Sequence, residues 1–378
     1  MDKTTRSIQY TIEPVLYLAF ELGSTEWKLG FTVGLGQNPR RRKVDARHLG
    51  ALQEEIGAAK KRFGLPEETV VKSCYEAGRD GFWLHRYLVT NGIENVIVDS
   101  ASIEVNRRAR RAKTDRLDVN KLVNMLIRYH SGEKKVWSVV HVPSEEAEDQ
   151  RHLHRQLSKW KGDRTRYSNR IKGLLAGHGV RLPVDGNFLE RVERVRMWNG
   201  APLPPGLRGR LEREYAGFQH TNQQIKELEA ARRELIRTSD HPSDKKVRGL
   251  LQLRGIGENS AWLFVKEFFG WRVFHNRREV GSLAGLTPTP HQSGEQSREQ
   301  GISKAGNRLV RGMIIEIAWG WLRHQPESEL TLWYQERFGQ GSKRVRKIGI
   351  GALARKLLIA LWRYVETGEI PEGAQFKP

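Results

Sequence analysis

Two aspartates stand inside the most basic stretch of the chain. Asp115 and Asp118 are three residues apart in "RRAKTDRLDVNKL", residues 110–122. Residues i and i+3 of a helix share a face, so both carboxylates could point at one spot. Two carboxylates repel each other and repel a phosphate, unless a divalent metal ion bridges them to phosphate oxygens. The spacing therefore indicates either a metal site or a simple helix start, with Thr114 as N-cap and acids that favour the helix dipole.

Basic residues flank this pair, and we expect them to hold a nucleic-acid backbone outside the metal site: Arg107, Arg108, Arg110, Arg111 and Lys113. The whole chain, 378 residues long, carries a formal net charge of +21, which favours a polyanionic partner. Nucleic acid is the first candidate, and an acidic membrane surface is the second. The sequence shows neither a signal-peptide core nor an apolar run that could span a bilayer, so we expect a soluble, cytoplasmic protein without a membrane partner. The single cysteine, Cys74, excludes a disulfide framework or a cysteine-ligated zinc site within one chain.

Two glutamates end predicted strands at matching places. Glu21 ends the first strand in "AFELGSTEWKLGF", and Glu76 ends the fourth in "SCYEAGRDGFW". A charged residue that ends an apolar strand near a glycine often lies at a functional sheet edge, although each could also be a solvated strand end. Together with Asp115 and Asp118 they make four carboxylates on two strands and one helix, a set that suits a two-metal phosphodiester site.

The order of predicted elements places these carboxylates in an α/β domain. Residues 15–46 read as three strands, and a helix, a strand, a helix, a strand, a basic loop and a helix from about Thr114 follow. This order predicts a mixed sheet with helices on both faces. Ribonuclease H-like nucleases have this order, but so do other α/β domains, so the order alone does not identify the fold.

From about residue 144 the pattern becomes helical, with two apolar stripes at heptad spacing. The first runs from Leu153 to Leu174 and the second from Leu207 to Ile225, with Asn222 at a seam position. Two interpretations stay open: one antiparallel helical hairpin, or a coiled coil that also joins two subunits. Residues 244–378 are again helical, with one irregular stretch at 285–303.

"LQLRGIGENSAWLFVKEF", residues 251–268, reads as a helix, a turn at Gly255-Ile256-Gly257 and a second helix. Such glycines let the backbone approach a phosphate, with amides of the following helix pointing at it. The stretch resembles a helix-hairpin-helix motif, and the alternative is a helix–helix turn without a ligand.

Three serines follow in a polar segment, Ser293, Ser297 and Ser303. Their spacing does not separate them as candidate nucleophiles, and the nearby His291 is weak evidence of activation. Ser303, which precedes Lys304, is most simply the N-cap of the next helix.

The quoted segments resemble a known family. "CYEAGRDGFWLHRYLVTNGIENVIVDS" followed by "AKTDRLDVNKL" is similar to the N-terminal domain of the insertion-sequence one-ten transposases, and "GLTP…HQSG…GISKAGNRLVR" is similar to their C-terminal domain. The resemblance implies a ribonuclease H-like, resolvase-like fold with a DEDD acidic site. Its Glu and paired Asp residues match Glu76, Asp115 and Asp118. Its first acid is an aspartate, where this chain has Glu21, a change that keeps the charge and adds a methylene.

The same resemblance implies the chemistry and the partners. Ser293, followed by Gly294, would be the nucleophile that forms a phosphoserine link to DNA, helped by Mg²⁺ or Mn²⁺ at the DEDD residues. Arg298 and Lys304, near this serine, are expected to contact nucleic acid together with Gly255 and Gly257. The partners would be donor and target DNA, a non-coding bridge RNA and further copies of the chain in a dimer or tetramer. The location would be the bacterial cytoplasm, at the nucleoid.

We therefore expect three parts: a ribonuclease H-like DEDD domain at 1–143, coiled-coil helices with a connection at 144–240, and a mainly helical transposase domain at 241–378. The predicted function is that of a DNA transposase of an insertion sequence. Two alternatives remain. A metal-dependent, junction-resolving nuclease would use the four carboxylates without Ser293. A decayed nucleic-acid-binding protein has Glu21 as its only support in the sequence.

Overall fold

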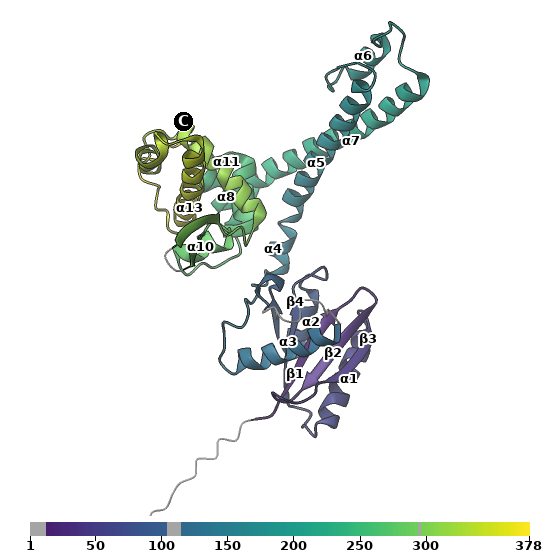
Figure 1. Ribbon diagram of the computed structural model, residues 1–378, viewed down its shortest axis with the longest axis vertical. Coiled ribbons are helices and arrows are strands. Elements are labelled where there is room, and N and C mark those ends of the chain that lie inside the picture. The colour runs from purple at the N-terminus through teal and green to yellow at the C-terminus, as the bar shows by residue number, and fades with distance from the viewer. Residues whose placement is uncertain (1–12, 104–114, 294–295) are drawn as a thin grey trace, which may run out of the picture. The chain divides into compact units, whose positions relative to one another are not determined.

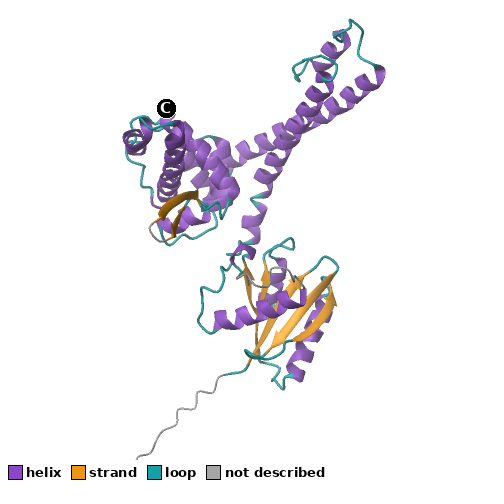
Figure 2. Ribbon diagram, viewed as in Figure 1, coloured by secondary structure: helices purple, strands orange, loops and turns teal. Residues whose placement is uncertain are grey.

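The computed structural model describes the backbone of residues 13–103, 115–293 and 296–378, and side chains within these ranges except those of 115–118 and 290–300. The chain divides into two compact units, residues 1–142 and 143–378, and each is described by itself. Figure 2 shows strands in the sheet of the first unit and in one hairpin of the second.

The first unit is built around a five-stranded mixed sheet with the order β3-β2-β1-β4-β5 (Figure 1). β2 pairs antiparallel with β1 and β3, whereas β4 is parallel to both β1 and β5. The elements are β1 (Val15–Leu22), β2 (Glu26–Thr32), β3 (Arg40–Asp45), α1 (Leu49–Arg62), β4 (Val70–Glu76), α2 (Trp83–Thr90), β5 (Glu94–Val98), the 3₁₀ turn η1 (Ser100–Ser102) and α3 (Asp115–His130).

Helices cover both faces of this sheet, as the sequence predicted. On one face, α1 and α2 bury Leu52 and Leu84 in a core with strand residues such as Phe20. On the other face, α3 buries Leu122 in a second core with Cys74 of β4. The alternation of side chains along each strand separates the two cores, because successive residues point to opposite faces.

The second unit begins with two long helices that pair with each other (Figure 1). The elements are α4 (Glu145–Asp149), α5 (His152–Ala176), α6 (Phe188–Arg194) and α7 (Pro205–Thr238). Lys161 of α5 pairs with Glu229 of α7 at 2.7 Å, and farther along α5 Arg170 pairs with Glu214 at 2.8 Å. Along α5 towards its C-terminus the partner residues lie progressively earlier in α7, so the two helices are antiparallel and form a hairpin within one chain.

The seam of this hairpin differs from the predicted one at one position. Asn222 is only half-buried, whereas its neighbour Thr221 is buried together with Ile225. Thr221 satisfies its hydroxyl within its own helix, by donating to the Phe218 carbonyl at 2.8 Å. Asn222 is therefore not buried in the seam between the two helices, where we predicted it.

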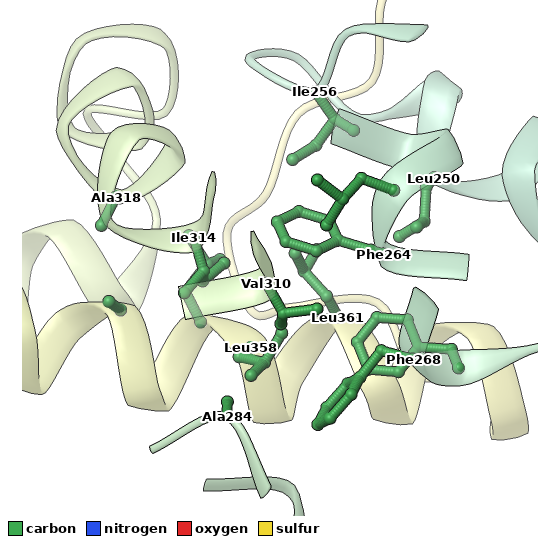
Figure 3. Close-up of a cluster of buried hydrophobic side chains, with 14 of the residues drawn as sticks. Leu250, Ile256, Phe264, Phe268, Ala284, Val310, Ile314, Ala318, Leu358 and Leu361 are labelled. Atoms are coloured by element: carbon green, nitrogen blue, oxygen red, sulfur yellow. The ribbon is translucent and has the colours of Figure 1, made fainter. Parts of the chain in front are cut away.

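A compact helical bundle with one hairpin completes the second unit. Its elements are α8 (Pro242–Gln252), α9 (Glu258–Phe264), the π-helical turn η3 (Val265–Phe269), α10 (Arg277–Leu283), β6 (Pro288–Ser293), β7 (Gln296–Ile302), α11 (Arg308–His324), α12 (Glu329–Tyr334), the π-helical turn η4 (Gln335–Gly339) and α13 (Lys343–Thr367). Figure 3 shows its apolar interior, where side chains from most of these helices meet: Leu250, Phe264, Phe268, Val310, Ile314, Leu358 and Leu361.

Two local expectations for this unit were wrong. The stretch 285–303 is not irregular, because β6 and β7 pair within it as an antiparallel hairpin. Ser303 does not cap the next helix; Asn307 does, by accepting from the backbone N–H groups of Leu309 and Val310.

Candidate functional site

Glu21 and Glu76 occupy matching positions on neighbouring parallel strands. Phe20 of β1 pairs in register with Tyr75 of β4, and the two glutamates are the next residue on each strand. Adjacent strands lie about 4.8 Å apart, so the backbones at these two positions are neighbours. Each glutamate also comes two residues after a residue of the α3-side core, Ala19 on β1 and Cys74 on β4. Both therefore belong to the face of the sheet that α3 covers.

The packing of α3 brings its first turns onto the same face. Gly30 of β2 has no side chain, and a Cβ there would lie 2.3 Å from Cγ1 of Val119, so the helix approaches the strand closely at this point. One turn later, the Leu122 carbonyl lies 3.8 Å from the Cys74 thiol sulfur. Positions 115 and 118 precede Val119 and Leu122 by four residues each. They therefore fall on the helix stripe that faces the sheet.

A hydrogen bond from the sheet edge also fixes α3. Nε of Arg41 on β3 donates to Oδ1 of Asn120 at 3.0 Å. Neither Gly30 nor Asn120 was singled out from the sequence as a residue that positions the acidic site. A glycine inside an apolar strand is the signal that could have suggested a close backbone approach.

The structure describes the side chains of Glu21 and Glu76 but not those of the other two proposed acids. The side chains of Asp115 and Asp118 are outside the described ones, and so are Arg107, Arg108, Arg110, Arg111 and Lys113. Among the side chains that the structure does describe, no group of three or more histidine, cysteine, aspartate or glutamate residues could hold a metal ion. Cys74 lies below the site but is fully buried, and burial raises the pKa of its thiol far above the ordinary range, so it does not supply a thiolate.

The serine candidates lie on the β6–β7 hairpin of the second unit. Ser293 ends β6 and pairs with Gln296 across the two residues 294–295, which lie outside the described backbone. His291 pairs with Arg298, so strand alternation gives positions 291, 293, 296 and 298 one shared face of the hairpin. Gln292 pairs with Ser297, which puts position 297 on the opposite face from Ser293.

The base of this hairpin is held by tight backbone contacts. Ser303 N donates to the Thr287 carbonyl at 2.8 Å, and Lys304, in a left-handed conformation with φ of 58°, donates to the Gly285 carbonyl at 3.1 Å. Gly306 has φ of +115°, and a Cβ there would lie 2.2 Å from the Leu283 carbonyl oxygen. The glycines of "AGLTP" and "KAGNR" therefore let the two segments at the base of the hairpin approach each other closely.

The Gly255-Ile256-Gly257 turn connects α8 and α9 as predicted. Gly255 has φ of +83°, and Gly257 is the residue before the first turn of α9. Cationic side chains lie beside the turn, because Lys377 Nζ donates to the Ile256 carbonyl at 2.8 Å. Arg254 binds Gln375 through side chains at 2.7 Å, so the C-terminal segment packs against this turn.

Comparisons with known proteins decide the family. Residues 247–332 match the model of the transposase IS116/IS110/IS902 family, a span that includes the glycine turn and the whole β6–β7 hairpin. The y4rJ protein of Sinorhizobium fredii, whose name describes it as a transposase, is 39% identical over 377 residues, which cover 96% of this chain and 94% of that protein. The chain belongs to this transposase family.

More distant similarity extends to transposases from other bacteria. The transposase for insertion sequence element IS1328 of Yersinia enterocolitica is 26% identical over 221 residues, 58% of this chain and 63% of the relative. That for IS1111A of Coxiella burnetii is 25% identical over 205 residues, 53% of each chain.

As a transposase, the protein acts on DNA, which it cuts and rejoins. Its excess of positive charge agrees with that substrate. Within the ranges that the structure describes, no helix is both long and apolar enough to cross a membrane.

Proposed function

We propose that this transposase cuts and rejoins DNA through a covalent phosphoserine at Ser293, assisted by Mg²⁺ or Mn²⁺ ions bound to Glu21, Glu76, Asp115 and Asp118. The observation that carries the proposal is the register of β1 and β4. It aligns Glu21 with Glu76 on the face of the sheet that α3 covers, and α3 begins with Asp115 and Asp118.

The topology supports a ribonuclease H-like assignment for residues 1–143. Three antiparallel strands, then two parallel strands with helices on both faces, agree with that fold. Residues 144–240 would then be the coiled-coil part and 241–378 the catalytic transposase part. The turn at Gly255 and Gly257, with cationic side chains beside it, supports a helix-hairpin-helix contact with a phosphate.

The donor set fits a hard divalent cation. All four proposed ligands are carboxylates, which Mg²⁺ and Mn²⁺ prefer, and the one cysteine nearby stays a neutral thiol. The ions would neutralise charge on the phosphate that reacts. Glu21 and Glu76 would hold them from the sheet, and Asp115 and Asp118 from the helix.

Ser293 would form a bond from Oγ to the phosphorus while the bond to one deoxyribose oxygen breaks. The serine proton ends on that departing oxygen, so atoms and charge balance. The phosphodiester energy is kept in the new serine ester, and a second hydroxyl can later reverse the step to join another strand. A hydroxyl needs a base or a metal ion to react at neutral pH. The acidic site would hold the metal ions for this activation, whether its residues belong to the same chain or to another copy.

The partners in this proposal are donor DNA, target DNA and a bridge RNA. Base pairing by the RNA would select the sequences, while Arg298, Lys304 and the basic segment from Arg107 to Lys113 hold nucleic-acid backbones. Several active sites are needed to exchange strands between two duplexes, so we propose a dimer or tetramer joined through the α5–α7 hairpin. Recovery of a specific RNA with the purified protein tests the RNA partner.

Products formed in cells test the proposed reaction. The transposase is expressed with the DNA that flanks its gene, and new donor–target junctions are amplified and sequenced. Ser293→Ala and Asp115→Asn should each abolish junctions, while Ser297→Ala, on the opposite face of the hairpin, should retain them. Broken ends that persist in Ser293→Ala would instead identify a metal-dependent nuclease. If the wild-type protein is folded and loaded with RNA but yields neither junctions nor breaks, the result would favour a non-enzymatic binding protein.

A further inference from the structure

A cationic groove lies in the second unit, and none of its lining residues is one proposed for catalysis. Its volume is about 660 Å³, and α10, α13 and the segment 369–372 line it, together with Glu329 and Leu330 of α12. Five basic side chains reach it from two helices: Arg277, Arg278, Arg355, Lys356 and Arg363. Three carboxylates also line it, Glu329, Glu369 and Glu372, so the cations exceed the acids by two.

Several of these cations have no partner among the side chains that the structure describes. The side chains of Arg277, Arg278 and Arg355 make no hydrogen bond or ion pair among the described residues. Arg363 reaches Glu369 only at 3.5 Å. Cations that converge in a cleft repel each other and attract anions into it. The excess of positive charge therefore favours an anionic ligand in the groove.

The packing of α10 against α13 leaves space for the side chain of Arg355. It is half-buried between α13 and α10, and it lies directly over Gly281, where a Cβ would come within 3.3 Å of its Cγ and Cδ atoms. Glycine at this position leaves the space that the arginine stem fills. On the same helix, Lys356 Nζ is held 4.6 Å above the ring of Trp333. A partly desolvated guanidinium binds a phosphate more strongly than an exposed one does.

The size and lining of the groove favour a single nucleic-acid strand over a duplex. Its volume matches sites that hold small molecules, so a duplex cannot enter it, whereas a short stretch of one strand can. Leu330, Ile359 and Ile370 add apolar side chains to its lining. A cationic groove that tracks a backbone, with apolar surface for the bases or sugars, is how proteins bind unpaired nucleic acid.

The groove also leads towards the serine hairpin. Thr287 lines the groove and directly precedes β6, which ends at Ser293. Six residues of strand span at most about 20 Å. We propose that this groove binds the phosphodiester backbone of an unpaired DNA or RNA strand and guides it to or from the hairpin. The guiding role rests on the proposed function of Ser293, but the binding itself does not.

Binding of single strands to the full-length protein tests the inference. Arg277→Gln with Arg278→Gln removes two exposed cations that pair with no residue in the described ranges, so the fold should persist. Affinity for oligothymidylate or oligouridylate should fall at least ~10-fold, and the log–log salt dependence should become shallower by about 1.4 for two lost phosphate contacts. Loss for the DNA strand alone or the RNA strand alone identifies the ligand, and loss for both indicates backbone recognition shared by the two.

Matched variants separate the groove from general charge. Lys226→Gln with Arg233→Gln removes the same charge from exposed positions of α7 and should leave the salt dependence unchanged. Arg355→Gln should weaken binding as well, and Arg355→Lys should restore most of it. Equal losses in the α7 and α10 variants, or a loss for duplex DNA larger than for single strands, would overturn the inference. Ser293→Ala should bind single strands like the wild type. The binding test of the groove can therefore be interpreted even if the proposed serine chemistry is wrong.

Discussion

Glu21 and Glu76 stand side by side at the carboxyl ends of two parallel strands, each one residue beyond the register pair Phe20–Tyr75. This relationship makes the two glutamates a unit, although 55 residues separate them in the chain. It also ties them to α3, whose contact with Gly30 and Cys74 sets where positions 115 and 118 lie.

Glu21→Asp should keep DNA breakage within ~10-fold of the wild type, because it keeps the carboxylate and only shortens its reach. Glu21→Gln keeps the shape but removes the charge, and should lower breakage by ~100-fold or more. Breakage is measured on DNA that carries the ends of the element, at several Mg²⁺ and Mn²⁺ concentrations. Equal activity of Glu21→Gln and the wild type would remove Glu21 from the metal site.

Gly30→Ala should displace α3, because the new Cβ would overlap Val119. Overpacking of this kind costs about 1–3 kcal/mol in the free energy of unfolding. Chemical denaturation measures the cost, and a second change, Val119→Ala, should recover part of it. Gly57→Ala in α1 is the control, because its Cβ would meet nothing within 4 Å. If both glycine variants behave alike, α3 does not depend on the close approach at Gly30.

Asn307→Ala should destabilise the start of α11 by about 1 kcal/mol, because two backbone N–H groups lose their acceptor. Ser303→Ala should cost less, because within the described residues the Ser303 hydroxyl has a single, long hydrogen bond, which it accepts from Thr287 at 3.3 Å. Thermal melting of the two variants compares the positions directly. A larger loss in Ser303→Ala would restore Ser303 as the helix cap.

Stability should fall as the pH drops below about 6.5, the ordinary pKa of histidine. Burial lowers the pKa of His154 in the folded chain, with Arg232 and Arg155 acting in the same direction and Glu267 opposing them. The unfolded chain then binds more protons than the folded chain, so the free energy of unfolding falls with pH by at most about 1.4 kcal/mol per unit for this group. His154→Gln should flatten that dependence in denaturation curves at pH 5 to 7. An unchanged slope would show that His154 does not carry it.

The first unit could largely be predicted from the sequence. Its strands other than the basic β3 are mainly apolar runs. The local pattern and the proposed site coincide at Glu21 and Glu76, which lie at strand ends. Heptad spacing predicted the two long helices and left open whether they form a hairpin or also join subunits. It could not decide that Thr221 rather than Asn222 would be buried.

The serine hairpin could not be predicted in the same way. The strands β6 and β7 are polar and contain Pro288 and Pro290, which argue against a strand when read alone. Backbone pairing and the tight glycine contacts beneath it hold the hairpin, and neither leaves an apolar pattern in the sequence. The cationic groove was missed for another reason. Its residues are spread from Arg277 to Glu372, and only the packing of α10 against α13 collects them.

In the proposed reaction Ser293 becomes joined to DNA with help from the acidic site. The bond can be detected if the transposase is expressed with its flanking DNA, the lysate is denatured, and the peptide that retains nucleotide is mapped by mass spectrometry. We expect a nucleotide on the peptide that contains Ser293, absent in Ser293→Ala and in Asp115→Asn, and unchanged in Ser297→Ala. Cleaved DNA with free ends and no modified peptide, or a modified peptide that persists in Ser293→Ala, would contradict it.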